Sequence, residues 1–335
     1  MRFTILPTLL AAGALSLAPS ATASGQGEQL DPVGTCRGMP ATHVGTEAEP
    51  LRTTDDDDVV VTNGAQRVRT GGGSDVVCVT GSLPSDVRPG SGDDLVDASA
   101  YAGSELYATF GSAPGDADTY LGGTHHDDVT LTGRGTADAT FTMTSGAGDD
   151  SLFVDPVYSG DVEATLGEGT DQAWFSSGSA GARLDGGEGR DQLTAQCSAC
   201  ELLVVDLEEG THFVAEEHGT ALGFEDANVS GIPGEPSPPT AVSVTGTAGS
   251  NRIGVDGCWV QVDAGAGDDR VANAGVPMGP CEEQGRYRLF GEAGDDVLRG
   301  HDGDDVLRGG PGHDTNHGRA GFDRCRAEVE RSCER

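Results

Sequence analysis

Acidic turns repeated every nine residues are the feature of this sequence that could perform chemistry. In the C-terminal part, a glycine opens each turn, a second glycine or other small residue lies within it, and an aspartate follows five residues after the first glycine. Glycine permits positive φ angles and leaves the backbone carbonyls of a turn accessible, and aspartate adds a hard anionic oxygen on a short side chain. The candidate metal-ligating residues of these four turns are Gly291, Gly294, Asp296, Gly300, Gly303, Asp305, Gly309, Gly312, Asp314, Gly318, Gly321 and Asp323.

Oxygen ligands at this spacing predict calcium binding. If successive turns stack as coils of a parallel sheet, equivalent oxygens lie roughly 4.8 Å apart. Ca²⁺ prefers oxygen ligands at about 2.3–2.6 Å, so an ion midway between two coils reaches both, whereas Mg²⁺ requires shorter bonds and stricter octahedral geometry. Carboxylates stacked at about 5 Å repel one another by roughly 3 kcal/mol per pair at an effective dielectric constant of 20. We therefore expect the binding of Ca²⁺ to be coupled to folding.

The same kind of corner recurs upstream of residue 291. Counting back from Asp296 by nines leads to Asp269, and further Gly-Asp corners end at more distant aspartates. Those at 150, 171 and 191 are spaced by 21 and 20 residues, which indicates one such corner per full coil with a plainer corner opposite. The upstream candidate ligands are Asp269, Asp191, Asp171, Asp150, Asp94 and Asp75.

Short strands must position these turns. Runs of β-branched, aromatic and other apolar residues of strand length follow the corners, as at 151–154 and 192–194, and return strands are expected at 139–143 and 202–205. No stretch has sustained helical periodicity. The sequence therefore predicts an all-β fold, a parallel β-roll or β-solenoid built from Gly-Asp-rich repeats.

Eight cysteines suggest that disulfides staple this fold. An even number of cysteines is typical of exported chains. Eight cysteines allow 105 connectivities, so proximity along the chain is the only guide to their pairing. It suggests local pairs, although Cys197 and Cys200 also frame a C-x-x-C motif that a redox or zinc site could use. The expected pairs are Cys36–Cys78, Cys197–Cys200, Cys258–Cys281 and Cys325–Cys333.

The N-terminus and the composition bear on compartment, domains and partners. Residues 1–23 read as a signal peptide, with Arg2, an apolar run over 5–17 and a cleavage site after Ala23, so we expect a secreted protein. A Pro-rich linker at 233–240 would divide an irregular solenoid at 24–232 from a C-terminal β-roll with a Cys-bracketed cap at 241–335.

The formal charge of −35, with all 20 cations being arginine, disfavours nucleic acid and anionic lipid as partners. No segment after residue 23 approaches the length needed for membrane insertion. Bound cations are the partners that such a charge favours.

The turns resemble a known calcium-binding repeat. Residues 186–193 match every fixed position of the RTX nonapeptide G-G-x-G-x-D-x-U-x, in which U is a large apolar residue. The four units from Gly291 match less fully, because only Gly310 keeps the second glycine and the last two units lack the apolar U. The sequence thus resembles the RTX, or hemolysin-type, calcium-binding repeat family.

This resemblance implies a parallel β-roll in which aspartates and turn carbonyls bind Ca²⁺ between alternate nonapeptides. Asp296 would then share an ion with the turn at Gly309, and Asp305 with the turn at Gly318. The opening at 36–46 and the Cys-bracketed last repeat also resemble Sec-exported, Arg-rich calcium-binding proteins of high-GC Gram-positive bacteria.

Three functions remain open at this point. The first is a secreted calcium-binding solenoid without enzymatic activity. The second is a calcium-dependent β-helix enzyme acting on acidic polysaccharide, as lyases do. Such an enzyme would need a cationic substrate groove, for which Arg134, Arg183 and Arg190 are few. The third is an adhesion or spacer protein stiffened by calcium, with a cell-surface or glycan partner. Clustered arginines on one sheet face would favour the second function, and a uniformly acidic surface the first.

Overall fold

The fold is described here from a computed structural model, whose second unit, Val33–Arg335, is compact. The residues described are 34–47, 49–83, 85–111, 113–133, 139–179, 181–198, 200–214, 216–232, 240–275, 281 and 285–334. The predicted signal peptide lies outside them, as do residues 233–239 of the predicted linker.

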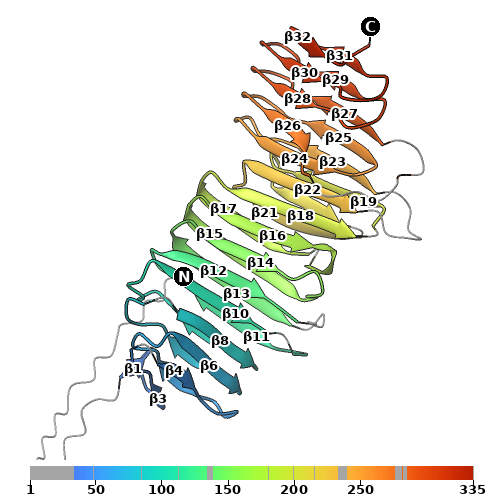
Figure 1. The fold of residues 1–335 in the computed structure, drawn as a ribbon. Helices are drawn as coiled ribbons and strands as arrows, with labels where there is room; N and C mark the ends of the chain where they lie inside the picture. The colour runs from blue at the N-terminus through green and yellow to red at the C-terminus, as the bar shows by residue number, and fades with distance from the viewer. Residues whose placement is uncertain are drawn as a thin grey trace, which may run out of the picture. The chain divides into compact units, whose positions relative to one another are not determined.

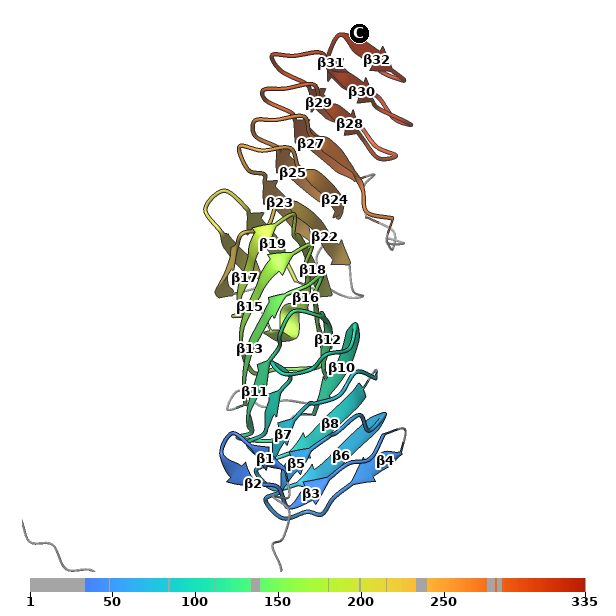
Figure 2. The same ribbon diagram turned by 90° about the vertical axis from the view of Figure 1, so that its left-hand side faces the viewer.

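Two long, mainly parallel sheets make up the second unit, and the chain passes from one to the other in turn. Figure 1 shows the resulting coils stacked in chain order up to β31 and β32. Figure 2 separates the sheets most clearly between β10 and β17, where even-numbered strands lie on the right and odd-numbered strands on the left. The all-β solenoid predicted from the repeats is confirmed.

Sheet I has 14 strands. They are β4 (Pro50–Arg52), β6 (Arg67–Gly72), β8 (Ser85–Ser91), β10 (Glu105–Phe110), β12 (His126–Leu131), β14 (Ser151–Val154), β16 (Gln172–Ser176), β18 (Gln192–Ser198), β22 (Asp226–Ile232), β24 (Arg252–Asp256), β26 (Arg270–Asn273), β28 (Val297–Arg299), β30 (Thr315–His317) and β32 (Val329–Arg331).

Sheet II has 16 strands. They are β3 (His43–Val44), β5 (Val59–Val61), β7 (Val76–Cys78), β9 (Leu95–Asp97), β11 (Ala117–Leu121), β13 (Thr140–Ala147), β15 (Asp161–Gly169), β17 (Arg183–Gly189), β19 (Leu202–Asp206), β20 (Thr211–Val214), β21 (Glu217–Leu222), β23 (Ala241–Thr245), β25 (Trp259–Asp263), β27 (Arg286–Phe290), β29 (Val306–Arg308) and β31 (Arg324–Arg326). A separate antiparallel pair joins β1 (Thr35–Cys36) and β2 (Met39–Pro40), and one 3₁₀ turn, η1, covers Ser177–Ser179.

Alternating side chains build the core between the two sheets. In the apolar strands every second residue points inward, as Leu106, Ala108 and Phe110 do in β10. Strand pairing stacks these inward residues on one another, for example Val260 on Tyr287 and Val262 on Leu289. The last coils bury only one such residue per strand, for example Leu298 in β28 and Leu307 in β29. So thin a core leaves much of the stability to the contacts of the turns.

An antiparallel insertion departs from the prediction of a regular parallel stack. Strands β19 and β20 pair antiparallel, as do β20 and β21, so sheet II runs in the order β17, β21, β20, β19, β23. Sheet I has no counterpart there, because β18 pairs directly with β22. The repeat phase did not reveal this hairpin, because its strands are ordinary in composition and only their pairing differs.

All four expected disulfides are present, which confirms the pairing inferred from proximity. They join Cys36 to Cys78, Cys197 to Cys200, Cys258 to Cys281 and Cys325 to Cys333.

The division of the mature chain at 233–240 stays a prediction. Strands pair directly across this segment, since β22 pairs with β24 and β19 with β23. Among the described residues, no helix has the length and apolarity to cross a bilayer.

Candidate metal centre

The acidic corners lie on two edges of the solenoid. We call the turns that lead into strands of sheet I edge I, and those that lead into strands of sheet II edge II. Ten equivalent positions on edge I form one column, which is called the edge I column below. Its members, in order, are Asp127, Asp150, Asp171, Asp191, Glu225, Asn251, Asp269, Asp296, Asp314 and Glu328.

Hydrogen bonds between coils define this column. The backbone N–H of Asp150 donates to Oδ1 of Asp171 at 2.7 Å, and that of Asp171 donates to Oδ1 of Asp191 at 2.8 Å. Further along, the N–H of Asp269 donates to Asp296 at 2.9 Å, and that of Asp296 to Asp314 at 3.0 Å. One carboxylate oxygen of each aspartate is therefore already used, because it ties its coil to the one before.

Edge II carries two shorter columns. The first consists of Asp58, Asp75, Asp94 and Asp118, linked by the same type of bond. The second consists of Asp305, Asp323 and Glu334 and begins at the backbone N–H of Tyr287. Alternate nonapeptides of the C-terminal repeat thus fall on opposite edges, and equivalent turns lie 18 residues apart.

Glutamates are the last members of the edge I column and of the second edge II column. The N–H of Asp314 donates to Oε2 of Glu328 at 2.8 Å, and the N–H of Asp323 donates to Oε2 of Glu334 at 2.5 Å. Glu328 lies in the coil that ends in β32 and takes the position that an aspartate occupies in the preceding coils.

The second carboxylate oxygen of most column aspartates is buried without a hydrogen-bond partner. Among the described residues this holds for ten aspartates, each at most 2 % exposed. A buried carboxylate oxygen that lacks a hydrogen bond or a cation is strongly unfavourable. The ten are Asp75, Asp94, Asp127, Asp150, Asp171, Asp191, Asp269, Asp296, Asp314 and Asp323.

The first glycine of each turn makes room for that oxygen. A Cβ atom placed on Gly291 would lie 2.2 Å from Oδ2 of Asp296, and one on Gly309 would lie 2.0 Å from Oδ2 of Asp314. Glycine is therefore required five residues before the aspartate, because the carboxylate occupies the space of a side chain.

A second glycine brings carbonyl groups of successive coils together. A Cβ atom on Gly312 would lie 1.9 Å from the carbonyl oxygen of Gly294, and one on Gly294 would lie 2.0 Å from that of Gly267. Turn carbonyls thus approach the next coil close to the column carboxylates. Carboxylate and carbonyl oxygens are the ligands that Ca²⁺ prefers.

Burial raises the pKa of four aspartates of the edge I column to a similar value, and neighbouring carboxylates raise it further. The pKa of Asp150, Asp171, Asp191 and Asp296 rises to about 6. The hydrogen bond from the adjacent coil lowers each pKa but does not offset burial. The columns therefore hold carboxylates that resist ionisation until a cation stabilises the charge.

Stronger increases occur on both edges. Burial raises the pKa of Asp94, Asp269 and Asp305 to about 7 and that of Asp118 to about 8.

Asp58 is the exception, at the N-terminal end of its column. Burial acts to raise its pKa, but hydrogen bonds from threonines outweigh burial and hold the pKa at about 2. Thr54 donates to Oδ2 through both its N–H and its hydroxyl, at 3.1 and 3.0 Å, and Thr42 donates to Oδ1 at 3.0 Å. The first carboxylate of this column is thus satisfied by the protein alone.

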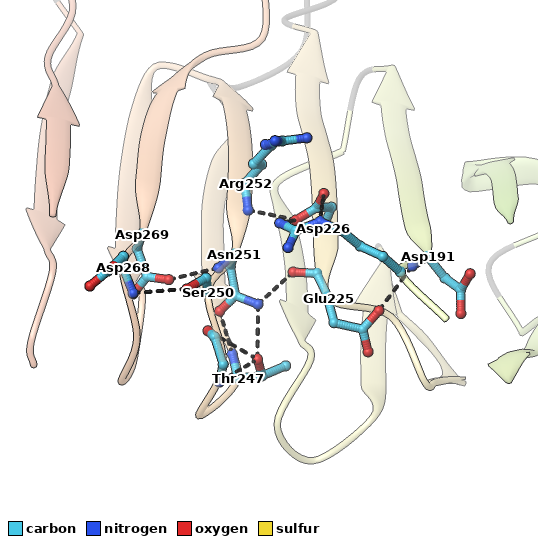
Figure 3. Close-up of polar contacts among 11 residues, drawn as sticks. Asp191, Glu225, Asp226, Thr247, Ser250, Asn251, Arg252, Asp268 and Asp269 are labelled. Atoms are coloured by element: carbon cyan, nitrogen blue, oxygen red, sulfur yellow. Dashed lines mark hydrogen bonds and ion pairs between the residues drawn. The ribbon is translucent and has the colours of Figure 1, made fainter. Parts of the chain in front are cut away.

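Figure 3 shows how the edge I column crosses the antiparallel insertion. The N–H of Asp191 donates to Oε2 of Glu225 at 2.9 Å, and the side-chain amide of Asn251 donates to the carbonyl oxygen of Glu225 at 2.5 Å. The N–H of Asn251 then donates to Asp269 at 2.7 Å. A neutral amide takes the place of an aspartate at this level.

The same level contains a cation of the protein itself. The Arg190 guanidinium forms two hydrogen bonds with Asp226, Nη2 to Oδ1 at 2.7 Å and Nε to Oδ2 at 3.0 Å. Oδ1 of Asp226 also accepts from the N–H of Arg252 at 2.7 Å. This carboxylate is therefore neutralised without a metal ion, whereas Asp191 and Asp269, on either side of the junction, leave Oδ2 without a partner.

Side chains alone do not complete a metal site. Among the described residues, no three His, Cys, Asp or Glu side chains converge on one point. Each ion would take one or two carboxylates from a column and its remaining oxygens from turn carbonyls. The unpartnered Oδ2 atoms and the close carbonyls fit Ca²⁺ in this role.

Comparison with known families agrees with this geometry. Residues 288–324 match the RTX calcium-binding nonapeptide repeat in four copies. This segment is an RTX repeat array. It extends from β27 to the first residue of β31 and includes two edge I turns and two edge II turns. No curated protein matches the chain.

The structure divides the sequence-predicted ligands between the two edges. The first edge II column contains Asp75 and Asp94, and the second contains Asp305 and Asp323. The remaining predicted aspartates, Asp150, Asp171, Asp191, Asp269, Asp296 and Asp314, belong to the edge I column.

Several column members were missed by sequence reasoning. Glu225, Glu328 and Glu334 stand outside any Gly-x-Asp motif, so the sequence offers no signal for them. The first edge II column begins at Asp58, although the nine-residue phase points to its exposed neighbour Asp57, which instead accepts the N–H of Ser74 at 2.8 Å.

Proposed function

We propose that this chain is a secreted calcium-binding protein whose Gly-x-Gly-x-Asp turns coordinate Ca²⁺ between stacked coils. The observation that carries the proposal is the set of ten column aspartates whose Oδ2 atoms are buried without a partner. Their arrangement leaves a carboxylate oxygen on coil after coil that a bound cation would satisfy once the carboxylate is ionised. The RTX repeat array at 288–324 supports Ca²⁺ as that cation.

Two pairs of aspartates in the array would hold ions. Asp296 and Asp314 would do so on edge I, together with carbonyl oxygens of the turns that begin at Gly291 and Gly309. Asp305 and Asp323 would do so on edge II. Bound Ca²⁺ supplies the positive charge that offsets carboxylate repulsion and desolvation in the columns. The protein in turn supplies oxygens already fixed by the hydrogen bonds between coils.

Coupling of ion binding to folding follows from the same electrostatics. Because the last coils bury only one apolar residue per strand and the columns hold closely stacked carboxylates, the C-terminal array without metal lacks the stabilisation that an ordinary core provides. We infer that ion binding drives the stacking of coils, most strongly in the thin C-terminal array.

Secretion rests on the predicted signal peptide and agrees with the four disulfides, which persist in oxidising compartments. We expect the exported protein to begin at Ser24, which intact-mass measurement would test. We assign the chain no enzymatic activity, because the aspartates recur with the repeat instead of forming one isolated acid–base pair.

Circular dichroism of residues 24–335 during calcium and EDTA titrations tests the proposal, with Mg²⁺ as the control ion. The expected result is a reversible gain of β-structure with Ca²⁺ alone, and bound ions detectable by metal analysis after dialysis. The double variant Asp296→Asn/Asp314→Asn should lose ions. Asp295→Asn/Asp304→Asn, which changes exposed neighbours, should retain them. Equal ion content in both variants, or a spectrum and ion content indifferent to EDTA, would overturn the assignment.

A further inference from the structure

Five arginines lie together on the outward face of the last strands of sheet II. They project from β27, β29 and β31, and all five are exposed. Strand pairing aligns Arg288 with Val306 and Arg324, and aligns Phe290 with Arg308 and Arg326. We call this set the arginine face. Its members are Arg286, Arg288, Arg308, Arg324 and Arg326.

No described carboxylate forms an ion pair with any of these arginines. The arginine ion pairs found in the described part of the chain involve other residues, such as Arg183 and Arg190. Asp263, on the neighbouring strand β25, is paired in register with Phe290 and accepts a hydrogen bond from Gln261 at 3.0 Å. A net positive strip thus stands on a chain whose formal charge is −35.

Such clustering has an electrostatic cost. Arg308 and Arg326 are on adjacent strands, roughly 4.8 Å apart. Two like charges at that separation repel by about 1 kcal/mol even in water. Uncharged side chains such as threonine would fit a solvent-facing strand without this repulsion. The placement is favourable only when an anion lies over the strip.

Shallow hollows and exposed aromatic rings accompany the arginines. One hollow is lined by Leu202, Trp259, Arg286 and Arg288, and an adjoining one by the same two arginines with Phe322 and Arg324. Trp259 is 41 % exposed and Phe322 is 56 % exposed.

A third hollow is lined by Phe290, Arg308 and Arg326, with Glu292 at the turn that follows β27. There the Arg308 guanidinium lies 5.8 Å from the centre of the Phe290 ring. The three hollows together line one face with both cationic and flat apolar groups.

We propose that the arginine face binds an acidic polysaccharide that carries carboxylates on successive sugar rings. Guanidinium groups bind carboxylates in a bidentate manner. Exposed tryptophan and phenylalanine rings stack on the apolar faces of sugar rings. Successive rings of an extended 1,4-linked chain face opposite sides, so every second carboxylate points to the strip. That repeat is close to the two strand spacings, roughly 10 Å, that separate Arg288 from Arg324. The proposal goes beyond calcium binding and assigns this face a separate ligand. Of the features expected of a polysaccharide enzyme, the arginine cluster supports the substrate class as a bound ligand, and the proposal includes no catalytic step.

The size of the strip favours a polysaccharide over nucleic acid. From β27 to β31 the arginines span two strand spacings, roughly 10 Å. That length receives a few sugar rings, whereas a nucleic acid duplex would extend over the acidic turns on both sides. Asp304, which lines the second hollow, marks one such border. Charges beyond about 8 Å are largely screened at physiological ionic strength, so the net charge of the chain does not prevent local binding.

The test uses the mature chain in calcium-containing buffer and a short α-1,4-linked oligogalacturonate as the probe. A Trp174→Phe background leaves Trp259 as the single tryptophan, because the chain contains two. Its fluorescence then reports on the arginine face, and calorimetry provides the Kd. Maltooligosaccharide of equal length is the neutral control, and a DNA oligonucleotide tests the alternative polyanion.

Two matched triple variants separate this face from general charge. Arg288→Gln/Arg324→Gln/Arg326→Gln removes three charges from the arginine face. Arg270→Gln/Arg299→Gln/Arg331→Gln removes three exposed charges from strands of sheet I in the same coils. We expect at least a tenfold increase in Kd for the first triple variant and less than twofold for the second.

Calcium titration of both triple variants completes the test. An unchanged calcium affinity with lost oligogalacturonate binding separates this proposal from calcium binding. Equal weakening by both triples, tighter binding of DNA or of maltooligosaccharide, or no oligogalacturonate binding by the unmodified protein would each overturn the proposal.

Discussion

Replacing one column aspartate by asparagine should have opposite effects with and without calcium. Asp171 lies in the middle of the edge I column, is fully buried, and leaves Oδ2 unpartnered. Asn251 already occupies an equivalent position as a neutral member of the column. Asp171→Asn retains the Oδ1 acceptor for the N–H of Asp150 and removes only the charge.

The expected gain without calcium follows from the pKa of Asp171. Burial raises that pKa from 3.8 to about 6. Since one pKa unit corresponds to about 1.4 kcal/mol, ionised Asp171 lowers the stability of the folded state by about 3 kcal/mol once the pH exceeds 6. The asparagine amide hydrogen lacks an acceptor there, which costs about 1 kcal/mol and reduces the gain in stability by that amount. In EDTA at pH 7.5 the variant should therefore be about 2 kcal/mol more stable.

In calcium the sign should reverse. A site filled at 1,000 times its Kd stabilises the folded state by about 4 kcal/mol. Losing one such site outweighs the gain of about 2 kcal/mol and leaves a net loss of about 2 kcal/mol. Asp171 faces coils on both sides, so the loss is larger if it serves two ions.

Urea unfolding followed by circular dichroism, with and without calcium, measures both effects. Where the EDTA form is unfolded, titration with trimethylamine N-oxide brings the transition into range. Asp149→Asn is the control, because Asp149 is the exposed neighbour whose Oδ1 accepts the N–H of Thr170 at 2.9 Å. Loss of stability in EDTA as large as that in calcium would refute the electrostatic reasoning.

Three further outcomes are expected. In EDTA the protein should lose β-structure as the pH rises from 4 to 7, because carboxylates with raised pKa values stabilise the folded state only while they are protonated. Circular dichroism measures this loss, and calcium should abolish it. Removing the Cys258–Cys281 disulfide, which spans 23 residues, should lower stability in calcium by about 3 kcal/mol in urea titrations, and an unchanged midpoint would contradict this. Gly291→Ala should abolish an ion of the array, because its Cβ would displace Oδ2 of Asp296, whereas Gly249→Ala, which meets no atom closer than 3.7 Å, should leave the ion count unchanged by metal analysis.

Most of the fold and about half of the site could be predicted from the repeat in the sequence. A fixed phase of glycine, aspartate and apolar residue predicts parallel coils, because only stacking gives every unit the same environment. The repeat also predicts glycine at 291 and 309. The physical reason, a clash between a Cβ atom there and the aspartate carboxylate, becomes visible only in three dimensions. The assignment of turns to edge I or edge II required the coil length, which varies between 17 and 27 residues in the bonds that join two column aspartates.

Other features depend on contacts that no local pattern encodes. Strand β20 resembles its neighbours in composition, and only its pairing partner makes it antiparallel. Glu225 joins the column through a side chain that reaches from outside the motif. The arginine face arises because Arg288 and Arg324, distant in sequence, align through the strand between them. Sequence reasoning named Arg183 and Arg190 instead, together with Arg134, which lies outside the described residues, and so underestimated the cationic surface.

The glutamates at the end of the columns have a consequence for assembly. A parallel stack has no inherent length, and its last coil offers free strand edges on which another molecule could continue growth. Glu328 and Glu334 satisfy the final column N–H groups from within the last coil itself. Neither residue presents the short acidic turn that would receive a further coil in register. We therefore expect duplication of an 18-residue unit upstream of them to lengthen the solenoid while leaving both hydrogen bonds in place.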